Sequence, residues 1–367
     1  PALLSLSAVR PLGHFNGFQV FYPDIASGEG AAPFKTLADY ENNLKRNRQY
    51  VTLIDAAIGR FREGMGSGIV QPRLVVRNMI EQLDTQIGHG VEASTFYGPV
   101  RTFPDAIASA DQARLKAAYA KQIGDEIIPA YTRLRDFLKS DYLPAAREGV
   151  GLVHMPGGDR LYAYLIEQNT TLPMTAEEVH TLGLSEVARI KTEMEAVKAQ
   201  TGFKGTLNQF FVHLREGAQY KYKTRDEMRD DFLAIGKRVD LRVREQFSVI
   251  PSTPLEIRAV PAYREKTDAG GSYIPGTPDG SRPGVFFYNA YDLPSRSKVG
   301  SETLYLHEAV PGHHFQISLA QENAALPPFM RFGGNTAYVE GWALYAETLW
   351  KELGVETDPY QRFGGLD

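Results

Sequence analysis

The chain has 367 residues, 43% of them hydrophobic, and its 40 basic and 44 acidic side chains leave a formal net charge of -4. The hydrophobic fraction is large enough to form a core. The near balance of charges argues against nucleic acid as the main partner. No apolar run approaches the roughly 18 residues of a membrane span, and the absence of cysteine leaves only nitrogen and oxygen ligands for a metal site.

The first residues bear on localisation. Pro1 stands where an initiator methionine is expected, and the apolar segment 2–9 is short and lacks a basic leader, so it is not a signal peptide. A missing initiator suits a processed export product or a trimmed chain. We therefore expect a periplasmic or otherwise exported protein, with the cytoplasm as the alternative.

Helices are predicted to dominate residues 1–250. Apolar residues recur at three- and four-residue spacing in five long stretches, and residues 207–216 predict a further short helix. Thr175 and Glu178 form a capping box at the start of the fourth stretch. The five stretches are 35–61, 70–86, 110–139, 175–200 and 225–245.

The pattern changes after residue 250. Proline and glycine cluster between Thr253 and Ser297, separated by three short runs typical of β-strands, at 256–260, 271–274 and 285–288. We expect a small twisted sheet there, followed by helices that carry the chemistry. The predicted fold class is mainly α with a small β-sheet (α+β), with a helical region at 1–250 and a catalytic region at 251–367.

Residues 305–314, Tyr-Leu-His-Glu-Ala-Val-Pro-Gly-His-His, hold three of the eight histidines beside a carboxylate. In H-E-x-x-H peptidases two histidines one turn apart bind Zn²⁺ and the glutamate activates water. In an unbroken helix His313 would lie about 120° off the face of His307. His314 would be nearly in phase but about 10.5 Å further along the axis. Neither reaches a zinc that His307 binds at about 2.0–2.1 Å.

A helix break resolves this conflict. Pro311 lacks an N–H and clashes with the preceding turn, and Gly312 permits backbone angles that other residues avoid. If Val310 and Pro311 form a bulge, the remaining residues give a regular metalloprotease helix with His313 as the second ligand. His314 is the alternative second ligand.

A later helix supplies a third ligand. It is predicted from about Thr336 to Leu353, ending at Gly354, and its Glu340 lies among apolar and aromatic residues where an unpaired carboxylate is costly to bury. A cation would be its partner. Glu347, two turns later, is a candidate for orienting a ligand histidine. The preceding metal helix is expected to start after Gly300, with Ser301 as its N-cap.

The pattern H-E-x-x-P-G-H-H followed by E-G-W-A-L-Y-A-E resembles the signature of the bacterial domain-of-unknown-function family 885, which is grouped with gluzincin-type zinc peptidases. The likeness is strong over residues 282–364 and continues more weakly back to about 151. It implies Zn²⁺ held by His307, His313 and Glu340, with Glu308 as general base, in a gluzincin-like, largely helical body around a cleft. Members of the family extend further at both ends, so the chain looks like a piece of a longer protein.

The resemblance also points to substrate-binding groups. In gluzincin-type peptidases the last strand before the metal helix lies at the cleft, where an extended substrate adds as another strand. Residues 285–289 are the candidate strand, with an ordinary core strand as the alternative. Tyr288, Tyr338 and His314 are candidate oxyanion or orienting groups.

The predicted function is zinc-dependent hydrolysis of peptide bonds, in which Glu308 accepts the proton of the attacking water and passes it to the leaving amine. Two alternatives stay open. One is a non-catalytic helical binding or scaffold protein whose metal site is structural or empty. The other is a metal-dependent hydrolase of non-peptide amides or esters. A structural zinc has four protein ligands, and a catalytic one has three plus water.

Overall fold

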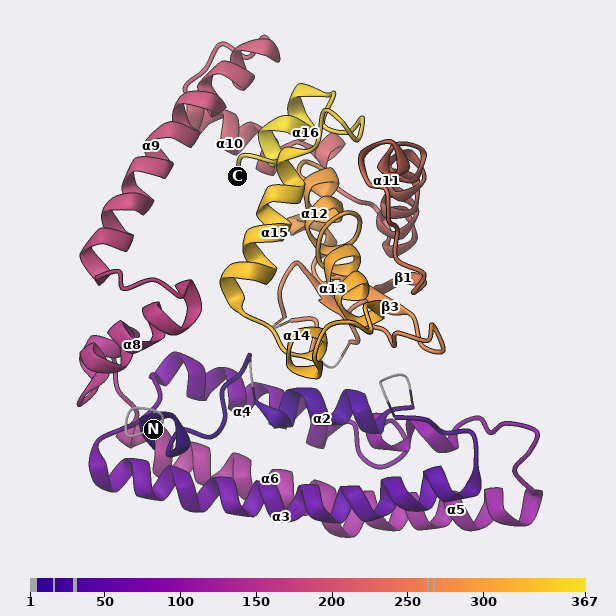
Figure 1. Ribbon diagram of the computed structural model, residues 1–367. Coiled ribbons are helices and arrows are strands. Elements are labelled where there is room, and N and C mark those ends of the chain that lie inside the picture. The colour runs from indigo at the N-terminus through magenta and orange to yellow at the C-terminus, as the bar shows by residue number, and fades with distance from the viewer. Residues whose placement is uncertain (1–4, 16, 29–31, 263, 267) are drawn as a thin grey trace. The chain divides into compact units, whose positions relative to one another are not determined.

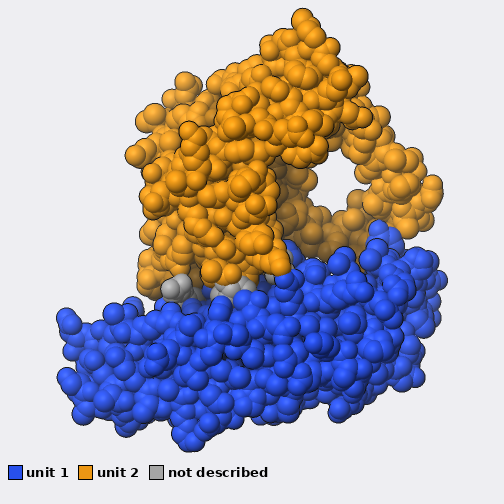
Figure 2. All heavy atoms as spheres, turned by 180° about the vertical axis from the view of Figure 1, so that it is seen from behind, with its two compact units in different colours: residues 1–164 blue, residues 165–367 orange. Residues whose placement is uncertain are grey.

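The computed structural model describes residues 5–15, 17–28, 32–262, 264–266 and 268–367 (Figure 1). The chain divides into two compact units, residues 1–164 and 165–367, which are coloured separately in Figure 2. The boundary falls within helix α8 (Gly158–Thr170). Among the described residues, no helix combines the length and the apolar character needed to cross a membrane.

Unit 1 is helical. Its longest helix, α3, starts with a capping box between Thr36 and Asp39 and is capped after Ser67 by Gly68, whose φ of 72° is a left-handed conformation that favours glycine. The predicted helix over 110–139 runs through two π-helical segments, η2 and η3, rather than as one regular helix. The elements are α1 (Ser5–Ala8), α2 (Phe18–Ala26), α3 (Leu37–Ser67), α4 (Arg73–Gly88), η1 (Thr95–Val100), α5 (Ser109–Gln122), η2 (Ile123–Ile127), α6 (Ile128–Phe137), η3 (Leu138–Tyr142), α7 (Leu143–Ala145) and η4 (Leu152–His154).

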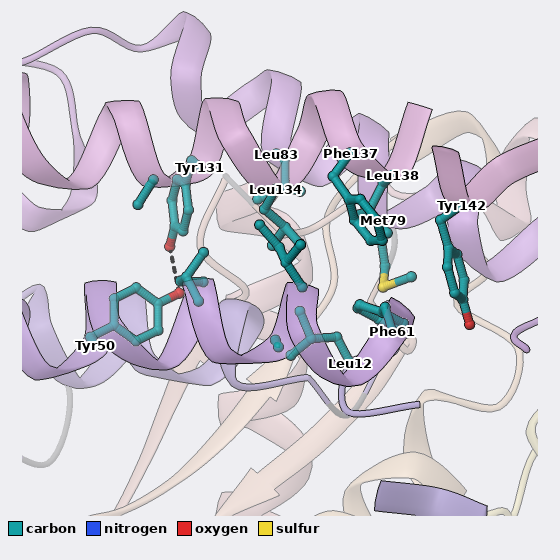
Figure 3. Packing of buried hydrophobic residues seen from close by; sticks show 14 of the residues in the cluster. Leu12, Tyr50, Phe61, Met79, Leu83, Tyr131, Leu134, Phe137, Leu138 and Tyr142 are labelled. Atoms are coloured by element: carbon teal, nitrogen blue, oxygen red, sulfur yellow. Dashed lines mark hydrogen bonds between the residues drawn. The ribbon is translucent and has the colours of Figure 1, made fainter. Parts of the chain in front are cut away.

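The core of unit 1 forms where α3, α4 and α6 pack together (Figure 3). Phe61, Met79 and Leu134 are fully buried there. The hydroxyl groups of Tyr50 and Tyr131 share a hydrogen bond of 2.8 Å inside this core, which satisfies two polar groups that burial would otherwise leave without a partner. Unit 1 therefore has a hydrophobic core of its own, formed between its helices.

After the last residues of α8, unit 2 continues with three helices, α9 (Ala176–Gln200), α10 (Leu207–Glu216) and α11 (Arg225–Gln246). A short 3₁₀ turn, η5 (Ala218–Tyr220), precedes α11. The capping box predicted at Thr175 and Glu178 is present at the start of α9. Apolar side chains of α11, including Phe232 and Val239, pack against the strands and helices that follow.

Three strands form one sheet among the described residues: β1 (Leu255–Ala259), β2 (Gly271–Ile274) and β3 (Gly284–Tyr288), in the order β1-β3-β2. β3 is parallel to β1 and antiparallel to β2, and all five of its residues are buried. The mainly helical class with a small sheet is thus confirmed. The central place of β3 contradicts its predicted role as a cleft strand open to substrate, because its ladder groups are paired on both sides.

The chain ends in η6 (Leu293–Ser295), α12 (Ser301–Glu308), α13 (His313–Glu322), α14 (Pro328–Phe332), α15 (Thr336–Thr348) and α16 (Pro359–Gly364). The predicted bounds need two corrections. The N-cap of α12 is Gly300, with φ 90°, and not Ser301, and α15 ends at Thr348, ahead of the predicted Leu353. In the latter case the segment from Leu349 to Gly354 forms turns instead of continuing the helix.

The division into compact units lies at residue 164, whereas the change in composition lies near residue 250. The two boundaries measure different properties. Helix α11 is similar in composition to the earlier helices, but it packs against β1 and α12 and so belongs with the sheet and the helices that follow it.

Candidate metal centre

The break between α12 and α13 brings the histidines together. Ala309 leaves the helical conformation, with φ -108° and ψ -103°, and the next helix starts at His313. A Cβ on Gly312 would lie 1.9 Å from the carbonyl oxygen of His307, so only glycine fits where the chain folds back against the end of α12. The interruption runs from Ala309 to Gly312, and is therefore longer than the two-residue bulge expected from sequence.

Three side chains from three helices meet next to this break. Glu340 Oε2 on α15 lies 3.4 Å from His307 Nε2 on α12 and 3.6 Å from His313 Nε2 on α13. The two imidazole rings are nearly perpendicular, with centroids 4.7 Å apart. The structure thus brings together the three residues expected to bind a metal.

The donor set suits zinc. Two imidazole nitrogens and one carboxylate oxygen form a common peptidase zinc ligand set, and bonds of about 2.0–2.1 Å in a tetrahedron place neighbouring donors about 3.3 Å apart. The candidate donor atoms of His307, His313 and Glu340 all lie within 4.8 Å of one another. The Glu340 side chain is half exposed, so one side of the cluster is open to solvent.

Glu347 orients the first histidine. Its Oε1 accepts a hydrogen bond of 2.7 Å from His307 Nδ1, and its Oε2 accepts one of 2.9 Å from Thr303 Oγ1. Because a carboxylate accepts, the proton sits on Nδ1 and the lone pair of Nε2 faces Glu340. Burial disfavours the charged form of His307, but the hydrogen bond to Glu347 and the nearby carboxylates outweigh it and raise the histidine pKa.

Glu308 is the carboxylate next to the first histidine. Only 7% of its surface is exposed. Burial raises the pKa of Glu308 to about 7, which the neighbouring His307 opposes and Glu340 and Glu347 reinforce. A carboxyl group with a pKa near neutrality can both accept and return a proton.

His314 points to the sheet instead of the cluster. Its Nδ1 lies 3.0 Å from the hydroxyl of Tyr273 on β2 and 3.5 Å from Ser318 Oγ. Burial lowers the pKa of His314 to about 4, which keeps the ring neutral and fits an acceptor Nδ1. The structure therefore places His313, and not the alternative His314, among the candidate ligands.

The two candidate tyrosines lie away from the cluster. The Tyr288 hydroxyl donates to the backbone oxygen of Arg225 at 3.5 Å, in the packing between β3 and α11. Tyr338 is 63% exposed, and two residues along a helix turn its side chain about 200° from Glu340. The structure brings neither hydroxyl to the three candidate ligands.

Trp342 is a residue that the sequence reasoning missed. Its Nε1–H donates a hydrogen bond of 2.7 Å to the carbonyl oxygen of Pro311, inside the break between the two histidine-bearing helices. Helix α15 thus contributes Glu340 to the cluster, Glu347 to the support of His307, and Trp342 to the connecting segment. The signal was available, because Trp342 stands two positions after Glu340 in the E-G-W motif.

A solved structure shares the fold over nearly the whole chain. The crystal structure described as that of the "putative lipoprotein from Colwellia psychrerythraea" is 27% identical, with a TM-score of 0.88. The match covers 96% of this chain and 62% of that one, so the chain spans less than two thirds of the length of its relative.

Comparison with the curated proteins gives no match. A family model does match, over residues 4–367, and its description is "Bacterial protein of unknown function (DUF885)". The match extends over both units and includes the elements that carry the histidine–glutamate cluster. The chain therefore belongs to the DUF885 family of bacterial proteins.

Proposed function

We propose that the chain is the metal-binding part of a zinc-dependent peptidase with a gluzincin-like site. The observation that carries the proposal is the convergence of His307 Nε2, His313 Nε2 and Glu340 Oε2 from three separate helices. These three residues would hold Zn²⁺. When bound, the ion supplies Lewis acidity, which polarises a substrate carbonyl and lowers the pKa of water.

The chain's own groups carry the proton transfers and the positioning. Glu308 accepts the proton of the attacking water and returns it to the leaving amine, a role that fits a buried carboxyl with a pKa of about 7. Glu347 keeps the His307 ring in the required orientation and tautomer. Trp342 holds the connecting segment between the histidine-bearing helices.

A peptide in extended conformation suits the edge of the sheet next to these helices. That edge belongs to β2, because β3 is central and β2 is the outer strand that contacts α12 and α13. β2 packs directly against α12, where a Cβ on Gly271 would lie 2.9 Å from a methyl carbon of Leu304. Substrate main chain would add to β2 as a further strand, in place of the expected β3.

Several observations bear on the alternatives. Within the described residues the cluster has three ligand-type side chains, which supports an open coordination position more than a structural site with four protein ligands. The description of the structural relative as a lipoprotein supports an exported location. A hydrolase of non-peptide amides would use the same groups, so the substrates that the protein cleaves distinguish this alternative from a peptidase.

A paired digestion experiment tests the proposal. The full-length protein, loaded with Zn²⁺, is incubated with a peptide library and with simple non-peptide amides, with and without a chelator. We expect chelator-sensitive peptide cleavage, and a loss of about 10²–10⁴-fold in kcat for Glu308→Gln with zinc content unchanged. Peptide cleavage that survives either treatment would contradict the proposal, and cleavage of the non-peptide amides alone would support the alternative substrate class.

A further inference from the structure

Glu340 is the most exposed of the three candidate metal ligands. Its side chain is half exposed, and its polar contacts within the described part of the chain are with His307 and His313. The start of α15 is exposed as well, since every residue of 336–341 except Val339 is exposed. Packing around the side chain therefore does little to fix this carboxylate, and its position depends on what holds the backbone of α15.

Gln316 on α13 contacts this part of α15 directly. Its Nε2 donates a hydrogen bond of 3.1 Å to the backbone oxygen of Tyr338, two residues before Glu340. Gln316 also follows His313 by three residues, and residues at that spacing lie on the same face of a helix. One face of α13 thus carries one candidate ligand and holds the backbone that carries another. The contact joins the two helices beside His313 Nε2 and Glu340 Oε2, which are 3.6 Å apart.

The other hydrogen bonds that tie α15 to the rest of unit 2 involve different parts of the helix. Glu347 and Trp342 join its later turns to α12 and to the connecting segment. Asn335 and Thr336 join its start to the end of α8, which carries no candidate ligand. Among the described residues, the hydrogen bond from Gln316 is thus the one that links the first turn of α15 to a helix with a candidate ligand.

The burial of Gln316 is costly for the protein without metal. The residue is 6% exposed, and its Oε1 is buried without a hydrogen-bond partner among the described residues. An unsatisfied buried acceptor costs about 1–3 kcal/mol. The carbonyl group of Tyr338 lies inside α15, where a helical N–H four residues later can satisfy it without Gln316. An apolar side chain of similar volume would therefore stabilise the metal-free protein at least as well.

We propose that Gln316 is a positioning residue of the candidate metal centre, and that it holds the first turn of α15 so that Glu340 reaches the ion bound by the two histidines. This inference rests on the proposed zinc site. Glu347 supports His307 directly, whereas Gln316 supports Glu340 through the backbone of α15. Its contribution should appear in the zinc affinity and not in the stability of the metal-free protein.

Gln316→Met tests the proposal in the full-length protein, because it keeps the side-chain volume and removes the amide. We expect zinc affinity, measured by competition with a chromophoric chelator, to fall about 10–100-fold. The melting temperature of the metal-free protein should stay the same or rise. Gln321→Met is the matched control, since Gln321 is a buried glutamine of the same helix that lies about 140° around it from Gln316. Its zinc affinity should equal that of the wild type.

A double-mutant cycle shows whether the effect passes through Glu340. In the Glu340→Ala background, Gln316→Met should change zinc affinity by less than about twofold, because the residue that it positions is absent. The absorption spectrum of the cobalt-saturated protein gives a second readout. Gln316→Met should shift this spectrum toward that of Glu340→Ala, because the carboxylate is no longer held at the ion, and Gln321→Met should leave it unchanged.

A wild-type zinc affinity in Gln316→Met would overturn the proposal, and so would an equal loss of affinity in the two backgrounds or in Gln321→Met. A lower melting temperature of the metal-free protein with unchanged zinc affinity would show that Gln316 is a structural residue only. A wild-type protein that binds no zinc would contradict the proposed function and this inference together. Zinc binding that is insensitive to Gln316 would contradict this inference alone.

Discussion

The two histidines of the candidate metal centre are held in place differently. His307 directs Nε2 to the cluster while Nδ1 is held by Glu347, and the second oxygen of that carboxylate is held by Thr303. His313 has no such partner among the described residues, because its buried Nδ1 makes no hydrogen bond. Only His307 is therefore held by a second side chain, and loss of its contact with Glu347 should have the larger effect on zinc affinity.

Glu347→Ala tests that contact. We expect zinc affinity to fall about 10–100-fold, because the His307 ring loses the partner that fixes its tautomer and orientation. Competition with a chromophoric chelator measures the change. Glu352→Ala, which removes an exposed carboxylate from the same region, is the control, and a wild-type zinc affinity in Glu347→Ala would show that the contact does not support the ligand.

At the scale of elements, the short segment between α12 and α13 decides the geometry of the site. This segment takes the place of one turn of helix. Its Gly312 packs directly on the carbonyl groups of Leu306 and His307. The hydrogen bond from Trp342 to Pro311 joins this segment to α15. The distance between the two histidines therefore depends on one close backbone contact and one side-chain contact.

Gly312→Ala should disrupt this segment. A methyl group 1.9 Å from the His307 carbonyl oxygen forces the backbone apart, at a cost of about 3 kcal/mol, and zinc binding should be lost. Chemical denaturation and zinc titration measure the two effects.

Gly341→Ala is the matched control, since a Cβ there would meet nothing within 4 Å. In a helix interior that change should stabilise the protein by about 0.5–1 kcal/mol. Equal behaviour of the two alanine variants would contradict the role given to Gly312.

The sequence carried enough information to predict much of the fold and the candidate ligands. The periodicity at 207–216 and the capping box at Thr175 gave element bounds, because both are local signals. The order of the strands could not be predicted from local signals. The three β-type runs look alike, and the pairing of β3 with both neighbours depends on long-range packing. Tyr288 was misplaced for that reason, since its role followed from the expected edge strand.

The choice between the two adjacent histidines illustrates the same limit. The motif did not decide whether His313 or His314 is the second ligand, because the directions of their side chains depend on where the helix restarts. In the structure α13 starts at His313, so the side chain of His314 points about 100° away from that of His313, toward Tyr273 on β2. Glu340 could be predicted because a carboxylate is unusual in such an apolar segment, although its exposure was not foreseen.

For the whole molecule, a buried carboxylate away from the cluster couples stability to pH. Glu356 is 2% exposed, and burial raises its pKa to about 7, an effect that Arg362 opposes and Glu302 and Glu347 reinforce. The ordinary pKa is 4.5. A pKa that is higher in the folded protein means that folding disfavours the charged form, so stability should fall as the pH rises from about 4.5 to 7.

Glu356→Gln removes this titration. The melting temperature of the variant relative to the wild type should therefore be higher at pH 8 than at pH 5, whatever constant offset the lost ion pair with Arg362 introduces. Differential scanning fluorimetry at both pH values measures the change, with the exposed Glu352→Gln as control. A difference that is the same at both pH values would contradict the assignment.

The location of bound zinc is the most direct measurement of the central claim. Anomalous diffraction at the zinc edge, from crystals of the zinc-loaded full-length protein, should show one ion bonded at about 2.0–2.2 Å to His307 Nε2, His313 Nε2 and a Glu340 oxygen, with no fourth protein ligand. Zinc bound at other residues, four protein ligands, or no zinc at this cluster would contradict the account.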